Sequence, residues 1–272
     1  MPLKDILVAF SNGSTSKTVL NFGLSLADQA GAKITAIHVT PPVMEENQIL
    51  SWMPERLMKQ VQRANEEAPI KAKEALDQQI GTFRTVNWRV ESGDVSDKLA
   101  SHSRLHDLLI VGKYAETTEE SGAHVRSEHI VTRSGRPLIV VPQSWSAGGP
   151  LKRVVAAWDG GLTATRALCD LLHLMPFIDH LDVVSVTQAS ENASPLKELR
   201  EHLSHHCQNF SVTALKPEGA TAIQILNYCR ETEADILAIG SRGTPRLRSG
   251  LVHGGTGRTI LDRSDTPVFV SY

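Results

Sequence analysis

The chain has 272 residues, of which 41% are hydrophobic and 21% are charged, and its formal net charge is −2 at pH 7. This near-neutral balance argues against broad electrostatic binding to nucleic acid or to an anionic membrane. No apolar run reaches the roughly 18 residues that a membrane span requires, and we expect no secretory signal at the N-terminus. The length predicts about two domains.

Short apolar runs rich in β-branched residues recur along the chain and predict ten strands. They are Ile6–Phe10, Ile34–Val39, Val86–Val90, Leu108–Val111, Leu138–Val141, Val154–Trp158, Leu181–Val186, Ser211–Leu215, Ile236–Ile239 and Val268–Ser271. Continuous hydrophobicity is typical of parallel strands that are buried on both faces. Between these runs, amphipathic stretches predict helices at Ser16–Gly31, Val95–Leu105, Thr163–Met175 and Ala222–Thr232. Strands that alternate with helices indicate a parallel, doubly wound α/β sheet.

Three sequence segments occur twice in the same order, which indicates two copies of one domain. Lys4–Phe10 corresponds to Lys152–Trp158, and Asp107–Lys113 corresponds to Asp235–Ser241. The third pair is Arg133–Val141 and Arg263–Ser271. We therefore predict a first domain over residues 1–146 and a second over 151–272, with Gly-Gly-Pro at 148–150 as the linker.

The offsets between the copies place an insertion in the first domain, at about residues 41–67. Its apolar residues predict an amphipathic helix broken at Pro54, either a flap packed on its own domain or an element that faces a partner or covers the cleft. After the insertion, Pro69 matches Pro195 of the second copy. We expect both prolines at the first position of the second helix, where the missing N–H is tolerated.

A glycine-rich loop follows the strand at Ile236–Ile239 and occurs in the second copy alone. It contains Gly240, Gly243, Gly254, Gly255 and Gly257, and the hydroxyl of Thr256 lies among them. Glycines allow a phosphate to approach the backbone, and the free N–H groups at the start of the next helix favour an anion. Four arginines add positive charge: Arg242, Arg246, Arg248 and Arg258. The alternative is that these glycines only permit tight packing of a helix on the sheet.

This second half resembles the universal stress protein family, whose nucleotide-binding members carry Gly-x-x-Gly, nine residues, then Gly and Ser or Thr. The resemblance includes Val154–Asp159, Ala234–Ser241 and Ser264–Val270 and covers nearly the whole chain in tandem form. It implies an adenine nucleotide alpha hydrolase-like fold, a five-stranded parallel sheet per domain in the order 3-2-1-4-5. It also implies that the last strands pair, so that the chain is an intrachain pseudo-dimer.

By the same resemblance, Asp159 lines an adenosine pocket and the backbone near Val186 meets the base. The site residues that we predict are Asp159, Val186, Gly240, Arg242, Gly243, Gly254, Gly255, Thr256 and Gly257. Asp159 can equally be read as a helix N-cap. The loop departs from the family pattern because ten residues separate Gly243 from Gly254 and the hydroxyl arrives only at Thr256.

The first copy lacks most of these features. Ser11 stands at the position of Asp159, and an acidic run that would repel phosphate follows Gly112. We expect no nucleotide there in the manner of the family and interpret this half as structural or regulatory.

The sequence therefore predicts a cytoplasmic universal stress protein that binds or senses ATP in its second domain, with the role of Mg²⁺ left open. The three cysteines, Cys169, Cys207 and Cys229, are typical of reduced thiols in the cytoplasm. No general base is recognisable, so at most slow ATP hydrolysis is expected. His202, His205 and His206 share a helix face, but without a second ligand cluster we predict no metal site. The alternative is a nucleotide-free interaction protein, and homodimer formation is left open.

Overall fold

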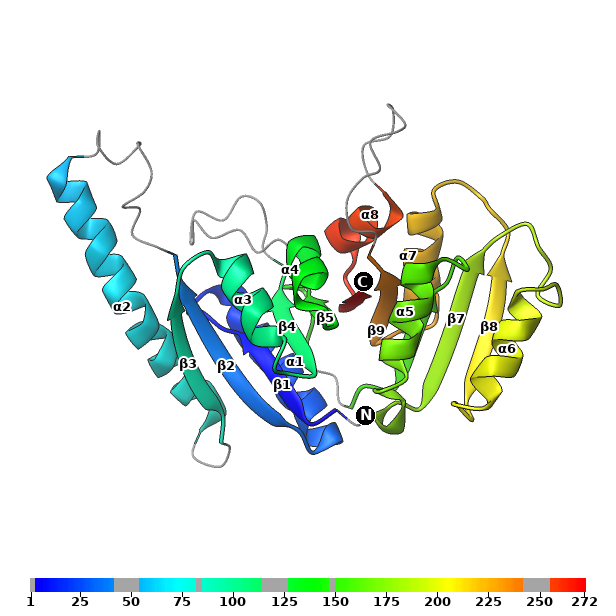
Figure 1. The fold of residues 1–272 in the computed structure, drawn as a ribbon, viewed down its shortest axis with the longest axis horizontal. Coiled ribbons are helices and arrows are strands. Elements are labelled where there is room, and N and C mark those ends of the chain that lie inside the picture. Colours follow the sequence, from blue (N-terminus) through cyan, green and yellow to red (C-terminus); the bar gives the residue numbers. More distant parts are fainter. Residues whose placement is uncertain (1–2, 42–53, 82–84, 114–126, 147–149, 242–254) are drawn as a thin grey trace.

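The structure, a computed structural model, describes residues 3–41, 54–81, 85–113, 127–146, 150–241 and 255–272 (Figure 1). The first half of the chain contains β1 (Asp5–Ala9), α1 (Ser14–Ala30), β2 (Lys33–Thr40), α2 (Glu55–Ile80), β3 (Asn87–Ser92), α3 (Val95–Ser103), β4 (Leu108–Gly112), α4 (Ser127–Ser134) and β5 (Leu138–Val141). The second half contains β6 (Arg153–Ala157), α5 (Leu162–Leu171), the 3₁₀ turn η2 (Met175–Phe177), β7 (His180–Val186), α6 (Leu196–Ser204), β8 (Phe210–Leu215), α7 (Thr221–Glu231), β9 (Ile236–Gly240), α8 (Thr256–Arg263) and β10 (Val268–Ser271).

The ten strands form one sheet in the order β3-β2-β1-β4-β5-β10-β9-β6-β7-β8. Within each half all neighbouring strands are parallel. β5 and β10 pair antiparallel, with Ile139 opposite Phe269. The α/β fold class and the strand order 3-2-1-4-5 predicted for each half are confirmed.

Helices cover both faces of the sheet (Figure 1). On one face, α1, α2, α5 and α6 pack their apolar side chains into a core that runs across both halves. On the other face, α3, α4, α7 and α8 do the same. The central strands are therefore buried on both sides, as their uninterrupted apolar sequences predict.

Two side chains of the first half hold backbone groups of the second half. The Gln29 amide donates to the carbonyls of Leu151 and Phe177 at 3.1 and 3.2 Å, and its oxygen accepts from the Leu151 N–H at 2.9 Å. Lys113, which follows β4, donates to the Asp262 carbonyl in the last turn of α8 at 2.5 Å. Side-chain contacts thus reinforce the β5–β10 seam near both of its ends.

The long helix α2 differs from the expectation for the insertion. Pro54 is its N-cap, and Pro69, predicted at the first helical position, lies inside the helix. The reason is the run of helix-forming residues from Glu55 onward, which carries the helix through Pro69. Pro195 is the N-cap of α6 rather than its first residue. Residues 42–53 of the predicted insertion lie outside the described residues.

His38 in β2 is a buried histidine, with 6% of its surface exposed. Its Nδ1 lies 3.1 Å from the Phe10 carbonyl, and its ring stacks on Trp88. Burial lowers the pKa of His38 below 6.5, although the hydrogen bond to Phe10 opposes this shift.

We expect this shift to make stability depend on pH. The unfolded chain binds the proton first as the pH falls, so the contribution of His38 is complete above pH 6.5 and declines below it. His38→Gln should therefore lose less stability than the wild type between neutral and mildly acidic pH, as measured by urea unfolding at several pH values. Identical pH dependence in the two proteins would contradict this expectation.

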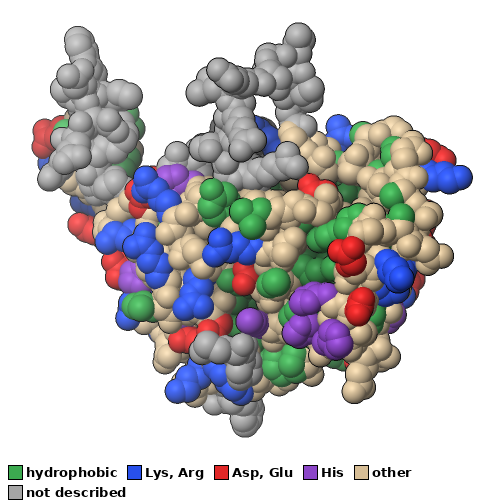
Figure 2. All heavy atoms as spheres, turned by 45° about the vertical axis from the view of Figure 1, so that its right-hand side comes forward, with side chains coloured by type: hydrophobic (Ala, Val, Ile, Leu, Met, Phe, Trp, Pro, Cys, Tyr) green, Lys and Arg blue, Asp and Glu red, His purple; other side chains and the backbone are tan. Residues whose placement is uncertain are grey.

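On the face in Figure 2, Lys and Arg side chains lie among Asp and Glu, which agrees with the small net charge. In the part of the chain that the structure describes, no helix combines the length and the apolar character that a membrane crossing needs.

Candidate functional site at the strand ends of the second half

The second half has its topological switch point between β6 and β9. These strands are neighbours, with Ala156 opposite Ala238, yet the chain leaves β6 toward α5 on one face and leaves β9 toward α8 on the other. In open α/β sheets, ligands bind in the crevice outside the carboxyl ends of strands at such a point. Asp159 follows β6 and Gly240 ends β9, so the fold places these two predicted site residues at this crevice.

Gly240 is required by the close approach of β9 to the first turn of α5. A Cβ atom at this position would lie 2.4 Å from the carbonyl carbon of Thr163 and 2.5 Å from the backbone nitrogen of Ala164. The corresponding Gly112 of the first half would meet only side chains, with the Thr15 Cγ2 at 2.7 Å. Gly240 therefore has a packing role whether or not a ligand binds.

We expect Gly240→Ala to destabilise the protein by about 1–3 kcal/mol or more, because backbone cannot rotate out of the way. Gly112→Ala is the matched control and should have a smaller effect, since the Thr15 side chain can change rotamer. Thermal unfolding midpoints compare the two. Equal losses would mean that α5 can shift away from β9 without difficulty.

Helix α5 begins at the crevice without a side-chain cap. Its N-cap is Gly161, not Asp159 as the cap interpretation expected, because Gly160 (φ +74°) and Gly161 intervene. The Asp159 carboxylate instead accepts a hydrogen bond from the Gly161 N–H at 2.8 Å. The next residue, Leu162, is 81% exposed and was not singled out by the sequence. Leu162 is the first residue of α5, and only the fold shows that this position lies at the crevice.

Helix α8 also begins without a side-chain cap, at Gly255. A Cβ atom on Gly255 would meet none of the described residues within 4 Å. The first intrahelical bond in this turn runs from the Thr259 N–H to the Gly255 carbonyl. The N–H groups before it are those that an anion would bind. Arg258 lies in this first turn and faces Asp262 at 3.8 Å.

The other predicted site residues are placed as follows. Thr256 and Gly257 are the first two residues of α8, and Val186 is the last residue of β7, the neighbour of β6. Arg242, Gly243 and Gly254 lie outside the described residues, as do Arg246 and Arg248.

The corresponding turn of the first half is bonded within itself. The Ser11 and Ser16 hydroxyls lie 2.8 Å apart, and the Ser11 N–H donates to the Ser16 hydroxyl at 3.0 Å. The Ser11 hydroxyl also accepts from the Gly13 N–H at 3.3 Å. Most of the acidic run after Gly112 lies outside the described residues.

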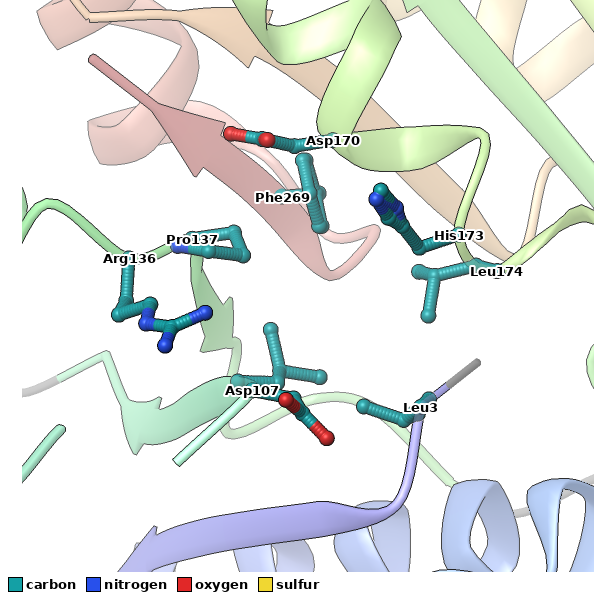
Figure 3. Close-up of a pocket in the computed structure, with 9 residues that line it drawn as sticks. Leu3, Asp107, Arg136, Pro137, Asp170, His173, Leu174 and Phe269 are labelled. Carbon is teal, nitrogen blue, oxygen red and sulfur yellow. The ribbon is translucent and has the colours of Figure 1, made fainter. Parts of the chain in front are cut away.

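A cavity of about 100 Å³ lies away from this crevice, beneath the β5–β10 seam (Figure 3). Residues that precede β1, β4 and β5 line it, together with the end of α5 and Phe269 of β10; they include Leu3, Asp107, Arg136, Pro137, Asp170, His173 and Leu174. The two carboxylates are already engaged. Asp107 accepts from the backbone N–H groups of Lys4 and Asp5, and Asp170 accepts from the Ser271 hydroxyl.

The histidines at the C-terminal end of α6 and just beyond it do not form a metal centre with other described residues. The rings of His202 and His206 are 4.8 Å apart. Within the described ranges, no group of three or more His, Cys, Asp or Glu side chains is placed to hold a metal ion. Cys207 is buried in the apolar core, where burial raises the pKa of its thiol. Burial likewise raises the pKa of Cys229 to about 12.

The fold defines an α/β protein whose candidate ligand site lies at the switch point of its second half. The family model of the universal stress proteins matches residues 2–142, which is more than half of the chain. The chain belongs to the universal stress protein family. The matched residues form the half that lacks the glycine loop.

Solved structures show the same fold over the whole chain. A universal stress protein from Archaeoglobus fulgidus is similar with a TM-score of 0.71 and 19% identity, covering 98% of this chain and 95% of its own. A functionally unknown protein from Pseudomonas aeruginosa PAO1 has a TM-score of 0.57 and 14% identity, covering 99% and 92%. A putative universal stress protein from Pseudomonas aeruginosa UCBPP-PA14 has a TM-score of 0.56 and 12% identity, covering 99% and 93%. No curated protein matches the chain.

Proposed function

We propose that the chain binds an adenine nucleotide, ATP, at the carboxyl ends of the second-half strands. It acts as a binding or sensing protein of the stress response in the cytoplasm rather than as an enzyme. The observation that carries the proposal is that α5 and α8 both begin at the β6/β9 switch point without a side-chain cap. Two helix N-termini that meet at one crevice with glycine N-caps favour a phosphate chain.

The surroundings of the crevice suit the rest of a nucleotide. No described residue would crowd a Cβ atom at Gly255, which suits phosphates beside α8, and the exposed Leu162 offers apolar surface on the α5 side. In this proposal Asp159 and the backbone near Val186 contact the nucleoside. The modules 1–146 and 151–272 form an intrachain pseudo-dimer joined at β5 and β10.

Thermal unfolding with and without ATP tests the proposal. At about one hundred times the dissociation constant, ATP should stabilise the wild type by about 2.7 kcal/mol, which raises the melting temperature by about 5 °C. In Gly255→Asp the new carboxylate caps α8 and repels phosphate. Its melting temperature without ligand should therefore not fall, while its response to ATP should disappear.

Gly13→Asp is the matched control, because Gly13 is the N-cap of α1 in the first half. This variant should keep the full response to ATP. A response lost in the Gly13 variant and kept in the Gly255 variant would place the site in the first half. Titrations with GTP and with Mg²⁺ establish the base preference and the role of the metal ion.

A nucleotide-free interaction protein is the second candidate, and the surface of α2 favours it. Leu57 and Val61 lie one turn apart on this helix and are 47% and 44% exposed. Such an apolar stripe on a projecting helix suits a protein partner. The absence of any response to ATP in the wild type, together with no nucleotide released from freshly purified protein, would favour this candidate.

A further inference from the structure

β3 is one of the two end strands of the sheet, and no described strand pairs with its outer edge. The Gly93 N–H donates to the Thr40 carbonyl of β2 at 3.0 Å. This bond shows which residues of β3 direct their backbone groups toward β2, because successive residues of a strand alternate in this respect. Arg89 and Glu91 therefore direct their backbone groups toward β2, whereas those of Trp88, Val90 and Ser92 point outward. No described residue makes a hydrogen bond to these outward groups, and Val90 is 45% exposed.

The opposite end strand, β8, has two of its corresponding backbone groups bonded to side chains. Thr35 of β2 and Asp182 of β7 occupy equivalent positions in the two halves, and they pair with Asn87 of β3 and Ser211 of β8. Trp88 of β3 therefore corresponds to Val212 of β8, and Val90 corresponds to Ala214. Arg200 donates to the Val212 carbonyl at 2.8 Å, and the Ala214 N–H donates to Glu191 at 3.2 Å. Side chains therefore occupy on β8 the positions that remain open on β3.

The charges of β3 are self-complementary in one register. If two β3 strands pair antiparallel about a two-fold axis at Val90, each Arg89 lies opposite a Glu91 of the other copy. These are non-hydrogen-bonded pairs with Cα atoms about 4.5 Å apart, where opposite charges attract. A two-fold axis at Arg89 or at Glu91 would instead place like charges opposite each other.

The same register uses all the outward backbone groups. Val90 pairs with Val90 and Trp88 pairs with Ser92 as hydrogen-bonded pairs. The Arg89 and Glu91 side chains are held on the α3 side of the sheet, Arg89 by His102 at 3.0 Å and Glu91 by Lys98 at 3.1 Å. Charges on an edge strand commonly prevent pairing. In β3, by contrast, the order of Arg89 and Glu91 lets the strand of a second copy bind through opposite charges.

We propose that the chain forms a homodimer in which the β3 edges of two copies pair antiparallel about Val90. The occupant of this edge is a second copy of the chain, and the assembly requires no nucleotide. The dimer joins the two ten-stranded sheets through the edge that is farthest from β8.

Light scattering after size-exclusion chromatography tests the proposal on the full chain. The wild type should have twice the monomer mass of 29.7 kDa. Val90→Pro removes an outward N–H without affecting the β2–β3 ladder, and it should give the monomer mass. Ala214→Pro at the equivalent position of β8 is the matched control and should remain dimeric. A wild type that stays at 29.7 kDa at high protein concentration, or a dimeric Val90→Pro, overturns the proposal.

Charge reversal provides a second test that does not depend on proline. Arg89→Glu and Glu91→Arg should each weaken the dimer by at least tenfold, because like charges then face each other across the axis. The double variant restores opposite charges and should recover dimerisation. Circular dichroism confirms that each variant is folded. If the single and double variants dissociate equally, the register about Val90 is wrong.

Cross-linking measures the register directly in a Cys169→Ser background. Val90→Cys opposes itself at a Cα separation of about 5.5 Å, which permits a disulfide under mild oxidation. Ser92→Cys lies four residues from its own copy in this register, a separation of roughly 14 Å that does not. Efficient cross-linking of Ser92→Cys and none of Val90→Cys would exclude the proposed pairing.

Discussion

Phe269→Ala should lower the free energy of unfolding by about 3–5 kcal/mol, the range for removing a fully buried aromatic side chain. Phe269 is 1% exposed and lies at the centre of the seam, opposite Ile139 of β5 and beside Ala238 of β9. It also lines the existing cavity beneath the seam, so that the truncation enlarges an empty space which the neighbouring strands cannot close. Urea unfolding followed by circular dichroism measures the loss.

Two controls show whether the loss comes from the cavity. Phe269→Leu should recover most of the stability, and Ile139→Val across the seam should cost only about 0.5–1.5 kcal/mol. A loss below about 1 kcal/mol for Phe269→Ala would mean that the seam can repack around a missing ring.

Asp182→Ala should destabilise the protein by about 3 kcal/mol. The Asp182 carboxylate is buried in β7, with 2% of the residue exposed, and it holds side chains from β7 itself and from both neighbouring strands, β6 and β8. It contacts Arg153 of β6 at 2.7 Å, His180 at 3.1 Å and the Ser211 hydroxyl of β8 at 2.6 Å. Removing one member of a buried ion pair costs about 3–5 kcal/mol, and the partial exposure of Arg153 places the effect at the lower end.

Thr35→Ala is the matched control, because Thr35 occupies in β2 the position that Asp182 occupies in β7. It should cost no more than about 1 kcal/mol. Ser211→Ala, which removes one of several hydrogen bonds to Asp182, should fall between the two. If Asp182→Ala cost as little as Thr35→Ala, water would fully hydrate the side chains of Arg153, His180 and Ser211 once the carboxylate is gone.

The fold was predictable from the sequence because the central strands of each half are buried on both faces and read as uninterrupted apolar runs. The strand order 3-2-1-4-5 was implied by the resemblance to the universal stress protein family, and the repeat extended it to both halves. The path of α2 was not predictable from its prolines. A proline is compatible with the first turn of a helix and with a continuing helix, and the residues before Pro69 determine which one forms.

The candidate site was predictable only in outline. The sequence indicated Asp159 and the glycines, but not that Gly240 meets the backbone of Thr163, because this contact joins elements far apart in the chain. It also could not distinguish a capping Asp159 from one that binds Gly161 ahead of the helix. These distinctions depend on φ angles and on the approach of β9 to α5, which local sequence does not encode.

The antiparallel seam between β5 and β10 has a genetic consequence, since both strands belong to one polypeptide. In an assembly of two identical subunits, every amino-acid replacement appears on both sides of the symmetry axis. Here each side can change alone: Asp182 has Thr35 as its counterpart, and the glycine loop is present on one side. Joining two modules in one polypeptide thus permits a single ligand per pair of modules. One module is then free to stabilise the other without binding anything itself.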